Sequence, residues 1–158
     1  MAGRQTTINF TGALLFILLA VSIVRGQTST RRPKIPGVSH VGFYVSNLPK
    51  TVAFWDDFLG YAEPYVLKRK DGSTRMAFIK INDRQHIELF AEEPPAGHSR
   101  LSHIAFLTDN AEQMRAYLQS RGIAVKPSVG AGRTGDLNFE VKDPDGHLVE
   151  FVQSQPAG

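Results

Sequence analysis

Two histidines and two glutamates in this 158-residue chain recur at matched places, and both residue types are common metal ligands. His40 stands in the segment Ser-His-Val-Gly-Phe, and His103 has the same place in Ser-His-Ile-Ala-Phe, 63 residues later. Glu88 lies in Ile-Glu-Leu-Phe, and Glu150 lies 62 residues later in Val-Glu-Phe-Val. A lone glutamate or histidine on a strand is usually a surface or structural residue. Two matched pairs, however, predict one shared site for a divalent ion such as Zn, Ni, Mn or Fe(II).

The repeat that carries these residues predicts two modules, at 38–91 and 101–153, each built as strand, helix, strand, strand, strand. In the first module, alternation and turn residues place strands at 38–46, 61–68, 75–81 and 85–90, and a helix capped by Asn47 that ends at Gly60. In the second, we expect strands at 101–108, 123–126, 136–142 and 147–153, and a helix capped by Asp109 that ends at Gly122.

The alternation within the strands places all four candidate ligands on one side. If Val41 and Phe43 pack beneath the first helix, His40 and Tyr44 face the other way. The same alternation turns His103 away from the core, and both glutamates lie between apolar neighbours that point toward the core. Each module therefore presents one imidazole and one carboxylate on the face away from its helix, and His86 shares the face of Glu88.

The composition excludes several classes of protein. The chain has no cysteine, so disulfides, zinc-thiolate sites, iron–sulfur clusters and a thiol nucleophile are ruled out. The formal net charge is +3, but without residues 1–26 the balance is nearly even and no basic stripe remains. We therefore expect a small-molecule substrate and no nucleic-acid partner.

The N-terminus has the layout of a targeting segment. Arg4 lies in a short polar start, and an uncharged, almost wholly apolar run follows from Phe10 to Val24. This layout predicts a secretory signal peptide at 1–26, cleaved before Gln27, and hence export to the periplasm or the medium. An uncleaved N-terminal membrane anchor is the alternative, although the run is shorter than the ~20 residues that span a bilayer. Residues 27–37 read as a polar linker.

The paired modules, with Ser-His-Val-Gly-Phe, Ile-Glu-Leu, Ser-His-Ile-Ala-Phe and Asp-Pro-Asp-Gly-His-Leu-Val-Glu, resemble the vicinal oxygen chelate superfamily. This superfamily includes glyoxalase I, fosfomycin-resistance thiol transferases, methylmalonyl-CoA epimerase and extradiol dioxygenases. The resemblance covers about 35–154 and implies an α+β fold: two βαβββ modules forming a cupped eight-stranded mixed sheet, with helices on the outer face, around one divalent metal. On the glyoxalase I pattern the ligands are His40, Glu88, His103 and Glu150; on the transferase or dioxygenase pattern Glu88 is not a ligand.

The resemblance implies a metal-dependent lyase or isomerase of the glyoxalase type. The metal would act as a Lewis acid on a small substrate with two adjacent oxygens, and Glu88 or Glu150 would act as general base. An Fe(II) dioxygenase of the extradiol type and a non-catalytic binding module like the bleomycin-resistance proteins are the alternatives. Relatives often share sites between two chains, so a homodimer is possible, and the sequence leaves open whether the modules pair within one chain.

Overall fold

The computed structural model describes residues 31–60, 65–132 and 134–154. The predicted signal peptide at 1–26 lies outside these residues. The first module contains β1 (Val38–Tyr44), α1 (Leu48–Leu59), β2 (Tyr65–Lys68), β3 (Thr74–Asn82) and β4 (Gln85–Phe90). The second contains β5 (Leu101–Leu107), α2 (Ala111–Ser120), β6 (Gly130–Ala131), β7 (Leu137–Lys142) and β8 (Leu148–Gln153).

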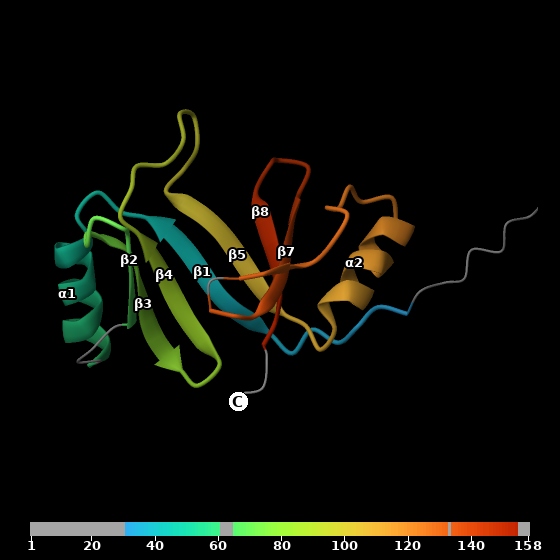
Figure 1. Ribbon diagram of the computed structural model, residues 1–158, viewed down its shortest axis with the longest axis horizontal. Helices are drawn as coiled ribbons and strands as arrows, with labels where there is room; N and C mark the ends of the chain where they lie inside the picture. The colour runs from blue at the N-terminus through green and yellow to red at the C-terminus, as the bar shows by residue number, and fades with distance from the viewer. Residues whose placement is uncertain (1–30, 61–64, 133, 155–158) are drawn as a thin grey trace, which may run out of the picture.

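The strands of the described ranges form one mixed eight-stranded sheet in the order β2-β3-β4-β1-β5-β8-β7-β6. β1 is parallel to β4, β5 is parallel to β8, and the two modules join where β1 pairs antiparallel with β5. The modules therefore pair within one chain, which the sequence left open. Figure 1 shows α1 and α2 at opposite ends of the molecule with the strands between them. The predicted α+β fold of two βαβββ modules is confirmed. Within the described ranges, no helix has the length and apolar character needed to cross a membrane.

Each helix covers its own hydrophobic core. Asn47 caps α1 by accepting a hydrogen bond from the backbone N of Lys50 at 3.1 Å, and Gly60 ends the helix in the left-handed conformation with φ 73°. Beneath α1 the buried core residues are Leu48, Ala77, Ile79, Ile87 and Leu89. Beneath α2 they are Ala111, Met114, Phe139 and Phe151. With an apolar core under each helix, the polar side chains of the central strands lie on the opposite face.

The helix cap predicted at Asp109 is wrong. Asn110 is the N-cap of α2, because its side chain accepts a hydrogen bond from the backbone N of Gln113 at 2.8 Å. The Asp109 side chain instead accepts one from the backbone N of Lys34 at 3.1 Å. Asn110 follows Asn47 at the same 63-residue offset that relates the two histidines, so the repeat itself contained the correct cap.

The strand predicted at 123–126 is also wrong, since this segment makes no ladder and the pairing with β7 is confined to the two residues of β6. The Lys126 carbonyl accepts a hydrogen bond from Arg115 Nη1 at 3.3 Å rather than from a neighbouring strand. Val125 and Val129 pack against the core under α2. The apolar residues there therefore reflect packing against the helix, and Pro127 follows directly, where a ladder donor would be missing.

Candidate metal centre

The four predicted ligands come from the four central strands of the sheet. His40 lies on β1, Glu88 on β4, His103 on β5 and Glu150 on β8. The parallel pairing of β1 with β4 sets Glu88 beside Gly42, and that of β5 with β8 sets Glu150 beside Ala105. A residue with little or no side chain therefore flanks each carboxylate.

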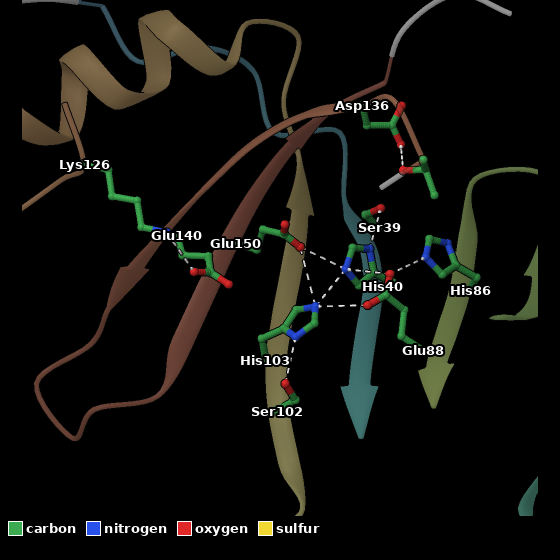
Figure 2. Close-up of polar contacts among 11 residues, drawn as sticks. Ser39, His40, His86, Glu88, Ser102, His103, Lys126, Asp136, Glu140 and Glu150 are labelled. Atoms are coloured by element: carbon green, nitrogen blue, oxygen red, sulfur yellow. Dashed lines mark hydrogen bonds and ion pairs between the residues drawn. The ribbon is translucent and has the colours of Figure 1, made fainter. Parts of the chain in front are cut away.

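These side chains converge on one point, and we call His40, Glu88, His103 and Glu150 the four-donor cluster (Figure 2). The Nε2 atoms of His40 and His103 are 2.9 Å apart. Glu150 Oε2 lies 3.0 Å from Nε2 of His40 and 3.5 Å from Nε2 of His103. Glu88 reaches the same two nitrogens with different oxygens, Oε1 at 3.7 Å and Oε2 at 3.6 Å. Sequence parity thus correctly placed all four on a common face.

The cluster has the chemistry and the spacing of a divalent-cation site. Zinc-type ions take imidazole nitrogen and carboxylate oxygen at about 2.0–2.2 Å, so donors that share one ion lie about 3.0–3.5 Å apart. The separations between the two Nε2 atoms, and from these nitrogens to the carboxylate oxygens, run from 2.9 to 3.7 Å. His40 and His103 are only 6% and 7% exposed, and such buried polar groups need partners. The residues present therefore fit a divalent ion.

A serine precedes each histidine and contacts its other ring nitrogen. Ser39 Oγ lies 3.2 Å from Nδ1 of His40, and Ser102 Oγ lies 3.2 Å from Nδ1 of His103. When Nδ1 donates its proton to the serine oxygen, Nε2 carries the lone pair. Partners of this kind fix the tautomer and the ring orientation of metal-binding histidines. In that tautomer of both histidines, the duplicated Ser-His pair would aim both Nε2 lone pairs at the same point.

The pKa shifts of Glu88 and His103 also favour the binding of a cation. Burial alone raises the pKa of Glu88, but a hydrogen bond from His86 and the positive potential of His40 outweigh it and hold this pKa below its ordinary value. Burial lowers the pKa of His103, and repulsion from His40 lowers it further. A neutral imidazole and an ionised carboxylate are the forms that bind metal.

His86 lies against the cluster without a matching residue in the second module. Its ring stacks on the His40 ring, with centroids 4.6 Å apart and planes at 23°. Its Nε2 lies 3.5 Å from Glu88 Oε1. In the second module, Leu148 has the corresponding place beside His103 on the neighbouring parallel strand.

A cleft of about 720 Å³ opens over the cluster and has two different walls. The first module contributes aromatic side chains, among them Tyr44, Phe78 and Phe90. The second contributes polar side chains, among them Asn138 and Glu140, together with apolar ones such as Phe139 and Leu148. Tyr44 was placed on this face by the alternation at β1. The sequence reasoning did not single out Phe90 or Glu140, although Phe90 follows Glu88 by two residues and Glu140 pairs with Glu150 across β7 and β8.

Comparison with known proteins shows the family of the chain. Residues 37–151 match the model of the Glyoxalase/Bleomycin resistance protein/Dioxygenase superfamily. The chain belongs to this superfamily, as its duplicated motifs indicated. Members of this superfamily usually use a divalent metal.

Three similar proteins illustrate the range within the family. The uncharacterized protein YwbC of Bacillus subtilis is 27% identical over 128 residues, which cover 73% of this chain and 96% of the relative. Lactoylglutathione lyase of Schizosaccharomyces pombe is 37% identical over only 60 residues, 38% of this chain and 18% of the enzyme. The crystal structure of methylmalonyl-CoA epimerase from Mycobacterium tuberculosis superposes with a TM-score of 0.65 at 19% identity, covering 82% of this chain and 95% of the epimerase. That likeness shows the fold alone.

Proposed function

We propose that this chain is a divalent-metal-dependent enzyme that catalyses glyoxalase-type proton transfer, as a lyase or isomerase, on a small oxygenated substrate. The observation that carries the proposal is the four-donor cluster itself. One imidazole and one carboxylate from each module meet in a cleft, where each carboxylate lies within 3.7 Å of both imidazole Nε2 atoms. A purely structural cluster would have no need to gather two acids and two histidines at the base of an opening.

The proposed chemistry divides between the ion and the carboxylates. When bound, a divalent cation supplies Lewis-acid polarisation of a substrate carbonyl. Glu88 and Glu150 approach the same point from opposite modules. One of the two carboxylates can therefore take a proton from the substrate carbon, and either the same carboxylate or the other one can return it. The lowered pKa of Glu88 favours its ionised form.

The cleft favours a substrate with two adjacent oxygens and an apolar portion. The oxygens would face the cluster and the polar wall that carries Asn138 and Glu140. The apolar portion would pack against the aromatic wall that carries Phe78 and Phe90. The partial match to a lactoylglutathione lyase supports carbonyl chemistry of this general kind.

A second candidate is an Fe(II) dioxygenase of the extradiol type. His40, His103 and Glu150 form a compact group, as His40, His86 and Glu88 also do. Glu150 lies nearer to the His40 and His103 imidazoles than Glu88 does. Two histidines and one carboxylate with open positions suit Fe(II) and oxygen activation. The two candidates differ in the role of Glu88, which is a ligand in the first and not in the second.

The test is metal analysis of full-length protein purified without chelator. We expect about one divalent ion per chain, lost in His40→Ala and His103→Ala and retained in His98→Ala, whose histidine lies exposed in the connector between the modules. Glu88→Gln should weaken binding if four ligands hold the ion and leave it unchanged if three do. Absence of binding for Zn, Ni, Mn and Fe(II) would overturn the enzyme proposal and leave a non-catalytic binding module.

Export and assembly are further parts of the proposal. The tripartite N-terminus supports cleavage before Gln27 and export, with an uncleaved anchor as the alternative. Mass spectrometry of the chain from its native compartment should find an N-terminus at or near residue 27, and an intact N-terminus in a membrane fraction would favour the anchor. For a homodimer, sedimentation should give twice the monomer mass, although all four donors come from one chain.

A further inference from the structure

The two modules support their donor pairs differently, and the difference lies at one position. His86 on β4 stands beside His40, whereas Leu148 on β8 stands beside His103 in the equivalent register. The duplication therefore placed an imidazole next to Glu88 and an aliphatic side chain next to Glu150. Leu148 can neither donate a hydrogen bond nor stack as a ring.

The His86 ring is held on two sides. It stacks on His40, with centroids 4.6 Å apart, and it contacts the Phe78 ring, with centroids 5.4 Å apart and planes at 50°. Its side chain is 28% exposed, so it borders the cleft while its neighbours restrict its rotation. A ring restrained in this way has a fixed direction for its nitrogen atoms.

That direction is toward Glu88. Nε2 of His86 lies 3.5 Å from Glu88 Oε1, a long hydrogen bond, and the other oxygen of the same carboxylate faces His103 Nε2 at 3.6 Å (Figure 2). A proton on Nε2 would therefore orient the carboxylate and leave Oε2 facing the centre of the cluster. Partners of this kind typically change metal affinity 10- to 100-fold when they are removed.

We propose that His86 is a positioning residue that acts through Glu88 and thereby sets the affinity of the metal centre. This inference rests on the proposed function, because it requires that Glu88 takes part in holding the ion. It makes the centre asymmetric: the carboxylate of the first module depends on a neighbouring imidazole, and that of the second does not.

Two variants separate the ring from its nitrogen. His86→Phe keeps an aromatic ring between His40 and Phe78 but removes the donor, whereas His86→Gln keeps a side-chain N–H at a similar reach. The dissociation constant for Zn²⁺, measured against a competing chelator, should rise about 10- to 100-fold in His86→Phe and by less than about threefold in His86→Gln. Leu148→Met is the matched control in the second module and should leave the constant unchanged. Thermal melts of the metal-free proteins check that the variants fold.

A double-mutant cycle with Glu88→Gln tests the route. If His86 acts through Glu88, His86→Phe should cost less than about twofold when Glu88 is already glutamine. The absorption spectrum of the Co²⁺ form should change in His86→Phe and match the wild type in His86→Gln. Tight Zn²⁺ binding by the wild type that is unaltered in His86→Phe would overturn this inference alone. Equal losses in both Glu88 backgrounds would also overturn it, whereas failure of the wild type to bind any metal would overturn the proposed function instead.

Discussion

Gly42 on β1 pairs directly with His103 on β5 at the junction of the two modules, and the imidazole occupies the space that a side chain at residue 42 would need. A Cβ on Gly42 would lie 2.6 Å from Cε1 and 2.7 Å from Nδ1 of His103. The absence of a side chain at this position therefore lets the His103 ring reach the four-donor cluster. The space left by the missing side chain is filled by the chain's own histidine.

Gly42→Ala should therefore damage the metal centre more than the fold. The added methyl group meets the end of a side chain, which can turn away, so we expect the ring to move rather than the backbone. The affinity for Zn²⁺ should fall by about tenfold or more, because His103 leaves its position. Chelator competition measures the affinity, and a thermal melt measures the stability.

Gly130→Ala is the matched control for this change. Gly130 lines the same cleft, but the nearest atom to an added Cβ is the Asn138 carbonyl oxygen at 3.9 Å, an ordinary contact. Its metal affinity should equal that of the wild type. An unchanged affinity in Gly42→Ala would show that His103 does not need its present position to bind the ion.

The serines that precede the histidines should tune the metal centre. Ser39→Ala or Ser102→Ala removes the oxygen 3.2 Å from Nδ1, so the imidazole loses the partner that selects its tautomer. We expect each change to weaken Zn²⁺ binding by about tenfold, and the double change to weaken it further. Ser128→Ala, which changes an exposed serine in the cleft lining, should have no effect. Equal affinities across all these variants would assign the serines a packing role only.

The helix caps give a prediction on stability that is independent of the metal. Asn110 accepts the backbone hydrogen bond at the start of α2, so Asn110→Ala should lower the free energy of unfolding by about 1 kcal/mol. Asp109→Ala, one residue earlier, removes only an exposed contact to Lys34 and should cost less. Urea titration of the metal-free chain measures both. A larger loss for Asp109→Ala than for Asn110→Ala would contradict the assignment of the cap.

The candidate site was predictable because two simple signals agree in each module. The 62- and 63-residue offsets matched the donors, and the alternation within strands such as 85–90, which the structure reproduces as β4, gave the face on which they lie. When one face of a strand is buried, the alternation of residues along the strand strongly determines the face toward which each side chain points. This is why His40, His103, Glu88 and Glu150 could be placed together from sequence.

The features that the sequence could not predict depend on contacts between segments that are distant in the chain. At 123–126, apolar residues pack on α2 without a strand partner, and a local pattern cannot distinguish the two kinds of burial. The pairing of β1 with β5 satisfies the same backbone groups whether it forms within one chain or between two, so the sequence could not choose. The partners of His86 likewise depend on the register of β1 with β4, which no local pattern encodes.

The turn before β8 gives a prediction on pH. His147 Nδ1 lies 2.9 Å from Asp143 Oδ2, and this hydrogen bond together with the negative charge raises the pKa of His147 above its ordinary value. The same hydrogen bond lowers the pKa of Asp143 below its ordinary value. Because the folded chain holds the His147 proton more tightly than the unfolded chain, its stabilising contribution is complete below the ordinary imidazole pKa. The contribution is lost as the pH rises through the raised value.

Asp143 contributes in the opposite direction, since its stabilisation is present above the ordinary carboxyl pKa and is lost as the pH falls through the lowered value. The ionised Asp143 and the protonated His147 therefore stabilise the fold together only between the lowered pKa of Asp143 and the raised pKa of His147. A titration of the imidazole resonances by NMR should find His147 titrating above the ordinary imidazole pKa. In Asp143→Asn the pKa of His147 should fall back toward its ordinary value, while the metal affinity stays unchanged because this pair lies outside the four-donor cluster. If His147 titrates at the same pH in the wild type and in Asp143→Asn, the contact does not persist in solution.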